Sequence, residues 1–129
     1  MKRILRIRPV PMFLLSVAAP SLLWASTLWI NKVPAREHER VNPIVDSAEA
    51  KAAGQLLYDD HCAKCHGDDA AGRGKRPSLL TDRVQNDATA GDLHWLLVNG
   101  SLRKGMPSWS RLPDQQLWQI VSYVKSLKR

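Results

Sequence analysis

The stretch His61-Cys-Ala-Lys-Cys-His-Gly67 places two cysteines three positions apart, with a histidine directly after the second. At the end of a helix, residues at this spacing lie on one side, so each thiol can add to one vinyl group of a haem. The adjacent histidine then reaches the iron from the same face. The C-x-x-C-H pattern at Cys62, Cys65 and His66 therefore predicts covalent attachment of a c-type haem.

Other interpretations of the cysteine pair are weaker. A structural zinc site needs four ligands, and this stretch offers three without a second cysteine pair to complete them. A thioredoxin-like redox pair expects a strand–helix–strand context, which the sequence lacks. A disulfide would suit an exported chain, but the histidine directly after Cys65 favours haem.

The sixth position on the iron requires a second side chain. Met106 is the single methionine after residue 12, and it lies in a Gly-Met-Pro loop, outside any helical stripe. A thioether ligand favours ferrous iron and raises the reduction potential. His61 is adjacent to Cys62 and would point away from the far face, while His94 falls in a predicted helix, where we expect a packed or partly exposed side chain. We therefore expect Met106 to be the sixth ligand.

The N-terminus has the composition of a membrane segment. Residues 10–30 carry no formal charge, and as a helix these 21 residues would rise about 30 Å, the thickness of the hydrocarbon core. The basic residues before them would stay in the cytoplasm by the positive-inside rule. A transmembrane anchor is favoured over a cleavable signal peptide, because small-residue cleavage sites are scarce. Both place the rest of the chain on the periplasmic side of the bacterial cytoplasmic membrane, anchored by residues 10–30 or, after cleavage, soluble.

The net charge of +7 is unevenly distributed. Lys2, Arg3, Arg6 and Arg8 contribute four of these charges, which leaves +3 for the rest of the chain. This excess lies where a membrane-insertion signal needs it, and no nucleic-acid motif follows. We therefore expect no nucleic-acid partner.

Helical signals dominate the second part of the chain, and no stretch shows the alternation of a strand. Ser47 can cap a helix, Thr89 and Asp92 can form a capping box, and Gly100 can provide a left-handed stop. Pro113 suits the first turn of a last helix. We expect helices over residues 47–61, 92–99 and 113–128.

The stretch before the first of these helices contains Pro34, Pro43 and mixed charges without an apolar period. Such a composition is typical of a short tether. We expect three parts: a membrane anchor or signal sequence over residues 1–31, a linker over 32–46, and a haem-binding domain over 47–129.

Over about residues 47–128 the sequence resembles the class I c-type cytochromes, in particular small bacterial mono-haem members. Gly54 and Tyr58 precede the first motif cysteine by eight and four positions, as the glycine and the aromatic of that family do. In that family the glycine lets the first and last helices cross closely. Ile120 and Tyr123 occupy the matching places on the last helix.

Other positions extend the resemblance. Pro77 lies eleven residues after His66, where the family's proline carbonyl accepts a hydrogen bond from the ligating histidine and fixes its tautomer. Residues 105–109, GMPSW, resemble the family's methionine loop, which is short in bacterial members. This implies that Trp109 covers a haem edge or propionate, with ordinary core packing as the alternative. The fold implied is all-α, with three main helices around one covalently bound haem, preceded by an N-terminal transmembrane or signal helix.

The sequence predicts an electron carrier, because His66 and Met106 would fill both axial positions of the iron and leave no open site for a small-molecule substrate. It would pass single electrons between redox protein partners and would not be an enzyme. One alternative is a haem-bearing subunit of a respiratory oxidase or dehydrogenase complex; another is a gas sensor or enzyme in which Met106 leaves the iron. Five basic residues are candidates for docking a redox partner: Arg73, Lys75, Arg76, Arg103 and Lys104. The alternative is that they are simply basic loop residues exposed to solvent.

Overall fold

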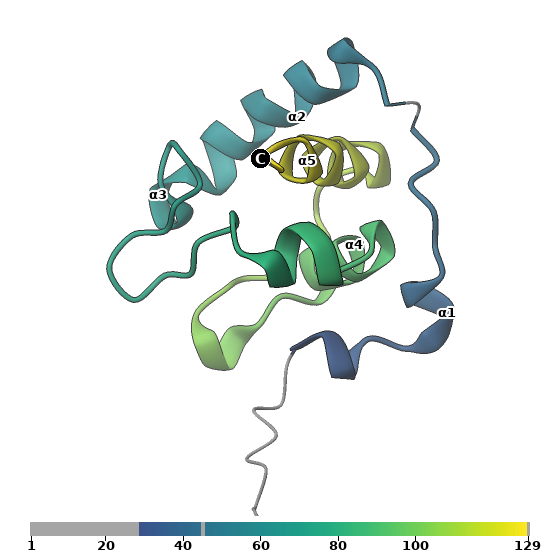
Figure 1. Cartoon of the computed structure of the whole chain (residues 1–129), viewed down its shortest axis with the longest axis horizontal. Helices are drawn as coiled ribbons and strands as arrows, with labels where there is room; N and C mark the ends of the chain where they lie inside the picture. The colour runs from purple at the N-terminus through teal and green to yellow at the C-terminus, as the bar shows by residue number, and fades with distance from the viewer. Residues whose placement is uncertain (1–28, 45, 129) are drawn as a thin grey trace, which may run out of the picture.

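The computed structural model describes residues 29–44 and 46–128 (Figure 1). In this part of the chain the helices are α1 (Ala35–His38), α2 (Ala48–His61), α3 (Ala63–His66), α4 (Ala90–Asn99) and α5 (Asp114–Ser126). Two 3₁₀ turns, η1 (Trp29–Lys32) and η3 (Leu102–Lys104), and one π-helical turn, η2 (Arg83–Asp87), lie between them. The described residues form two isolated β-bridges and no strand. The predicted all-α class is confirmed.

The predicted membrane segment, residues 10–30, falls outside the described ranges except for its last two residues. Among the helices that the structure does describe, none combines the length and the apolar character that crossing a bilayer requires.

The pairing of α2 with α5 forms the centre of the domain. Ser47 caps α2 by accepting a hydrogen bond from the backbone N–H of Ala50, as predicted. Gly54 is buried where the two helices meet. One turn further on, Tyr58 is fully buried, and its ring lies 5.2 Å from the ring of Tyr123 on α5, centroid to centroid.

Helix α4 begins with the predicted capping box, in which Thr89 and Asp92 exchange side-chain and backbone hydrogen bonds. Gly100 ends it with a φ of 68° and a ψ of −171°. The positive φ agrees with the expected left-handed stop at Gly100, but its ψ is extended and differs from the ψ of a left-handed helical residue. Helix α5 begins one residue later than predicted, because Pro113 is its extended N-cap and not part of its first turn.

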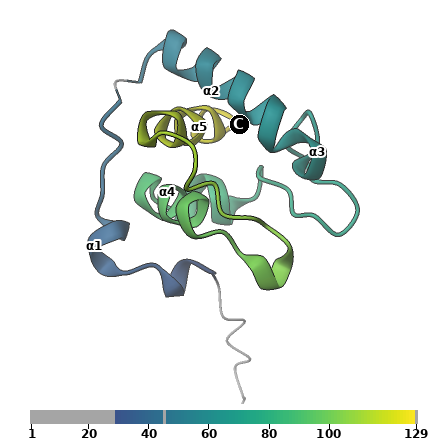
Figure 2. The ribbon, with the colours of Figure 1, turned by 180° about the vertical axis from the view of Figure 1, so that it is seen from behind.

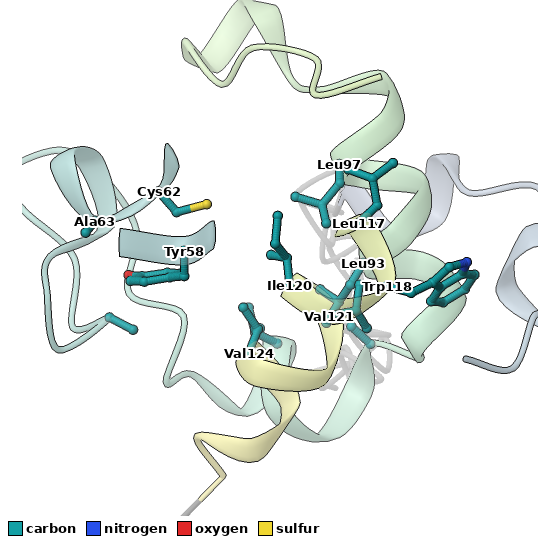
Figure 3. Packing of buried hydrophobic residues seen from close by; sticks show 13 residues of the cluster. Tyr58, Cys62, Ala63, Leu93, Leu97, Leu117, Trp118, Ile120, Val121 and Val124 are labelled. Carbon is teal, nitrogen blue, oxygen red and sulfur yellow. The ribbon is translucent and has the colours of Figure 1, made fainter. Parts of the chain in front are cut away.

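The apolar core gathers between α2, α4 and α5 (Figure 3). The predicted buried face of α5 is largely confirmed, although Leu127 is only half-buried and the fully buried Trp118 was not expected there. The largest contributions from α4 and α5 come from Leu93, Leu97, Leu117, Trp118, Ile120, Val121 and Val124.

The turn η2 has no counterpart among the sequence predictions. A side chain from α5 holds this turn, since the Lys125 ammonium donates to the carbonyl oxygen of Gln85 at 2.7 Å and to that of Ala88, the residue after the turn, at 2.9 Å. Burial lowers the pKa of Lys125 from its ordinary value. A lysine about 40 residues away in the sequence thus stabilises a turn that no local pattern indicates.

Residues 29–44 form a segment that we call the N-terminal strap. It runs along one side of the domain, from α1 beside α4 towards the start of α2 (Figure 2). Gly91 allows this close approach, because a Cβ atom at that position would overlap the carbonyl oxygen of Glu37 and lie 2.9 Å from that of Arg40. The absence of a side chain on α4 therefore lets the strap backbone lie directly on it.

Polar contacts hold the strap in place. The Nδ1 atom of His38 lies 2.9 Å from the fully buried carboxylate of Asp92, and the Thr89 hydroxyl donates to the carbonyl oxygen of His38. Further along, the Asn42 amide donates to the Ser122 hydroxyl at 2.8 Å. Residues 32–46 were expected to be a linker, and these contacts pack residues 37–42 of that stretch on the domain. The boundaries at residues 31 and 46 stay predictions.

Candidate haem site

The three residues of the attachment motif share one helical turn at the end of α2. Cys62 ends α2 and begins α3, and its carbonyl oxygen accepts a hydrogen bond from the backbone N–H of His66 at 2.9 Å. Both cysteines are free thiols, Cys62 buried and Cys65 half-buried. Figure 3 shows the Cys62 sulfur pointing from this turn towards Ile120 and Leu97. The Cys62 side chain therefore faces the apolar interior of the domain.

The surroundings of Cys62 suit an uncharged sulfur. Burial, with a smaller contribution from Cys65, raises the pKa of the Cys62 thiol to about 12. A thiolate is the form that a structural metal or a redox reaction requires. A thioether to a porphyrin carries no charge, so this environment fits covalent haem attachment better than metal binding by a thiolate.

His66 is oriented by the loop that follows it. Its Nδ1 atom lies 2.9 Å from the carbonyl oxygen of Pro77, in agreement with the implied contact. A carbonyl oxygen only accepts hydrogen bonds, so Nδ1 carries the proton and donates. The lone pair of Nε2 is then available to a metal, and the ring is held in one orientation.

Two glycines shape this loop. The hydroxyl of Tyr58 donates to the carbonyl oxygen of Gly67 at 2.7 Å, and the N–H of Gly72 donates to the carbonyl oxygen of His66 at 2.7 Å. Gly72 has a φ of 89°, and a Cβ atom there would lie 2.7 Å from the carbonyl oxygen of Arg76. Gly72 therefore allows a close backbone approach that only the folded loop reveals.

Met106 lies at the end of a tight loop after α4. Its backbone exchanges two hydrogen bonds with that of Ser101, at 2.8 and 3.1 Å. Gly105 precedes it in the left-handed conformation, with a φ of 77°. The Met106 side chain is half-buried and packs against the core cluster. The Met106 side chain therefore lies at the rim of the core, and its role as a ligand stays a prediction.

Trp109 follows the methionine loop and is half-buried. Its backbone N–H donates to the carbonyl oxygen of Leu97, which ties the loop to α4, and its ring lies 5.1 Å from the ring of His61. The stretch from Pro107 to Leu112 lines a hollow of 590 Å³. Trp109 thus lines this hollow, and its ring also packs on His61 at the end of α2.

The two alternative histidines have other partners. His94 is buried, stacks on Trp118 with ring centroids 4.0 Å apart, and places Nε2 at 2.7 Å from a carboxylate oxygen of Asp114. The expectation that His94 is a packed histidine agrees with this. His61 faces Trp109, and no described contact draws either histidine towards His66.

These elements define the class of protein: a small helical domain with a C-x-x-C-H turn, a histidine oriented by a carbonyl and a methionine loop. A profile of the family described as "Cytochrome C oxidase, cbb3-type, subunit III" matches residues 49–124. The chain belongs to this family of c-type cytochromes, whose members carry covalently bound haem with iron.

Curated relatives contain the domain in different settings. The chain is 37% identical over 91 residues to the cbb3-type cytochrome c oxidase subunit CcoP of Rhodobacter capsulatus, covering 61% of this chain and 30% of the relative. It is 33% identical over 95 residues to the quinohemoprotein alcohol dehydrogenase ADH IIB of Pseudomonas putida, covering 72% of this chain and 13% of the relative. It is 33% identical over 87 residues to cytochrome c-554(547) of Halothiobacillus neapolitanus, covering 60% of this chain and 96% of the relative. The chain thus spans less than a third of the first two relatives and nearly all of the third.

Proposed function

We propose that this chain transfers single electrons through one haem c, attached at Cys62 and Cys65, with His66 and Met106 as axial ligands. When bound, the haem supplies an iron that alternates between the ferric and ferrous states. The observation that carries the proposal is the 2.9 Å contact from Nδ1 of His66 to the Pro77 carbonyl, which leaves Nε2 free to bind iron. Membership of a c-type cytochrome family supports the same role.

The residues of the chain have separate tasks in this proposal. Pro77 orients the His66 ring, so that the ligand needs little rearrangement when the iron changes its charge. Met106 favours the ferrous state and raises the potential, and Trp109 excludes water from one edge. With both axial positions occupied there is no open coordination site for a substrate, so we propose a carrier and not an enzyme.

The partners are redox proteins outside the cytoplasmic membrane. Arg73, Lys75 and Arg76 lie in the exposed loop after the motif, and Arg103 and Lys104 lie exposed in the methionine loop. Such charges attract an acidic partner surface and raise the association rate. The uncharged residues 10–30 support a periplasmic position held by a membrane anchor, with signal cleavage as the alternative.

Covalent attachment is tested by extraction. Haem should stay with the full-length protein through acid–acetone treatment, and the double variant Cys62→Ala, Cys65→Ala should lose it. Lys64→Ala, which changes the exposed residue between the cysteines, should keep the haem. Free extraction of haem from the wild type would overturn the proposal.

Axial ligation is tested with carbon monoxide. The reduced wild type should bind it weakly, because Met106 occupies the sixth position, and Met106→Ala should bind it readily. Equally tight binding by both proteins would favour a gas sensor or enzyme with an open site.

A second candidate is a haem-bearing subunit of an oxidase or dehydrogenase complex. The family description and the similarity to CcoP favour an oxidase, and the dehydrogenase relative favours the other setting. Purification in mild detergent distinguishes the two cases. A fixed subunit would co-purify with larger proteins in stoichiometric amounts, whereas a carrier would separate from them.

A further inference from the structure

The side chain of Arg76 connects the two loops that carry the proposed axial ligands. Arg76 directly precedes Pro77, whose carbonyl oxygen accepts the hydrogen bond from His66. The Nη1 atom of Arg76 donates to the carbonyl oxygen of Lys104 at 2.8 Å and to that of Gly105 at 3.2 Å. These carbonyls belong to the two residues immediately before Met106. The loop that orients the histidine therefore holds the loop that presents the methionine.

The backbone of Arg76 is well anchored on the histidine side. Its N–H donates to the carbonyl oxygen of Arg73 at 2.9 Å. Its own carbonyl lies against Gly72, which in turn donates to the carbonyl oxygen of His66 at 2.7 Å. The guanidinium therefore projects from a part of the loop that His66 itself helps to fix.

Gly105 is adapted to the guanidinium on the other side. Besides its positive φ of 77°, a Cβ atom at this position would lie 2.5 Å from Nη1 of Arg76 and 3.2 Å from its Nη2. Glycine thus leaves room for the Arg76 side chain to reach the backbone. Arginine suits this role, since its planar group presents several donors in fixed directions, whereas lysine offers one flexible charge.

We propose that Arg76 is a positioning residue that clamps the methionine loop closed and thereby maintains the bond from Met106 to the iron. The inference rests on the proposed axial ligation. A thioether is a weak ligand, so its occupancy depends on how often the loop opens. Hydrogen bonds from a charged donor to the loop backbone reduce that opening. An external ligand for the iron binds only to the open form, and its apparent affinity reports the open fraction.

The experiment measures imidazole binding to the ferric full-length protein, together with the sulfur-to-iron absorption band near the red end of the spectrum. Arg76→Gln should bind imidazole about tenfold more tightly than the wild type, because the two exposed hydrogen bonds from Nη1 to the loop backbone are lost together. Arg76→Lys keeps the charge without the planar group and should fall between them. Lys75→Gln removes a charge from the neighbouring exposed position and should match the wild type.

The outcomes separate this inference from the function on which it rests. A ferric wild type without the sulfur-to-iron band would overturn the Met106 ligation. If the wild type shows the band but Arg76→Gln binds imidazole no more tightly than Lys75→Gln does, the Met106 ligation stands and only the proposed role of Arg76 is overturned. Equal tightening in Arg76→Gln and Lys75→Gln would also overturn it, because the effect would then follow charge and not hydrogen bonding. A lower reduction potential in Arg76→Gln, with no change in Lys75→Gln, is the expected second readout.

Discussion

Gly54 of α2 lies directly against the backbone carbonyl of Gln119 in α5. A Cβ atom at residue 54 would overlap the Gln119 oxygen and would lie 2.9 Å from the Cβ atom of Tyr123. The sequence predicted a close crossing against Ile120 and Tyr123; the contact with Tyr123 agrees, but Gln119 takes the place of Ile120, which is buried in the core. Because the obstructing Gln119 atoms belong to the backbone, they cannot rotate away.

We predict that Gly54→Ala destabilises the protein, with Gly54→Val more severe. In an open helix, alanine would gain about 0.5–1 kcal/mol over glycine. Here the added methyl group must separate two helix backbones, and such overpacking costs about 1–3 kcal/mol. The free energy of unfolding, followed by denaturant titration of the Soret absorbance, measures the balance.

Ala52→Val is the matched control, since residue 52 is exposed on the same helix. It should lower the free energy of unfolding by less than about 1 kcal/mol through helix propensity alone. If Gly54→Ala proves as stable as the wild type, the two helices do not cross tightly at this residue.

A second prediction concerns the buried phenol of Tyr58. Tyr58→Phe removes the hydrogen bond to Gly67 and leaves a carbonyl oxygen without its donor, which costs about 1–3 kcal/mol near neutral pH. The same measurement of unfolding detects this loss. Tyr123→Phe is a useful comparison, because its side chain is only partly buried.

The cost of Tyr58→Phe should shrink in alkaline solution. Burial raises the pKa of Tyr58 above its ordinary value, so the folded protein keeps a proton that the unfolded chain releases above about pH 10. The stability of the wild type then falls as the pH rises, by up to about 1.4 kcal/mol per unit, and the variant lacks this term. A difference between the two proteins that stays constant from pH 9 to pH 11 would contradict the assignment.

The third prediction tests the N-terminal strap. Gly91→Ala should push the strap away from α4, because the new methyl group would overlap the carbonyl oxygen of Glu37. Trypsin should then cut after Arg36 and Arg40 faster than in the wild type. Gly74→Ala adds a methyl group where nothing lies within 4 Å; its positive φ of 59° strains only that loop, far from the strap, so cleavage in the strap should be unchanged. Mass spectrometry of the fragments gives the rates, and rapid cleavage of the wild-type strap would mean that it is not held.

The fourth prediction concerns the proposed sixth ligand. Met106→His should lower the reduction potential markedly, because a thioether favours ferrous iron more than an imidazole does. It should also abolish the sulfur-to-iron band of the ferric protein. Leu102→His provides the control, since it adds a histidine at an exposed position of the same loop. If both variants keep the wild-type potential and band, another residue occupies the sixth position.

The sequence by itself determined the features that depend on neighbouring residues. The Ser47 cap, the capping box of Thr89 and Asp92, and the C-x-x-C-H turn are local arrangements, in which the interacting groups lie within four positions of one another. Family resemblance added one longer contact, from His66 to Pro77, because the eleven-residue spacing is itself a pattern in the sequence.

The tertiary structure alone decided the contacts between distant residues. His38 meets Asp92 across 54 positions, Arg76 reaches Lys104 across 28, and the Gly54 crossing is set by a backbone oxygen of Gln119. These contacts involve backbone atoms or single polar groups, which leave no periodic trace in the sequence. They depend on the packing of the apolar faces of α2, α4 and α5, because that packing brings groups far apart along the chain within hydrogen-bond distance.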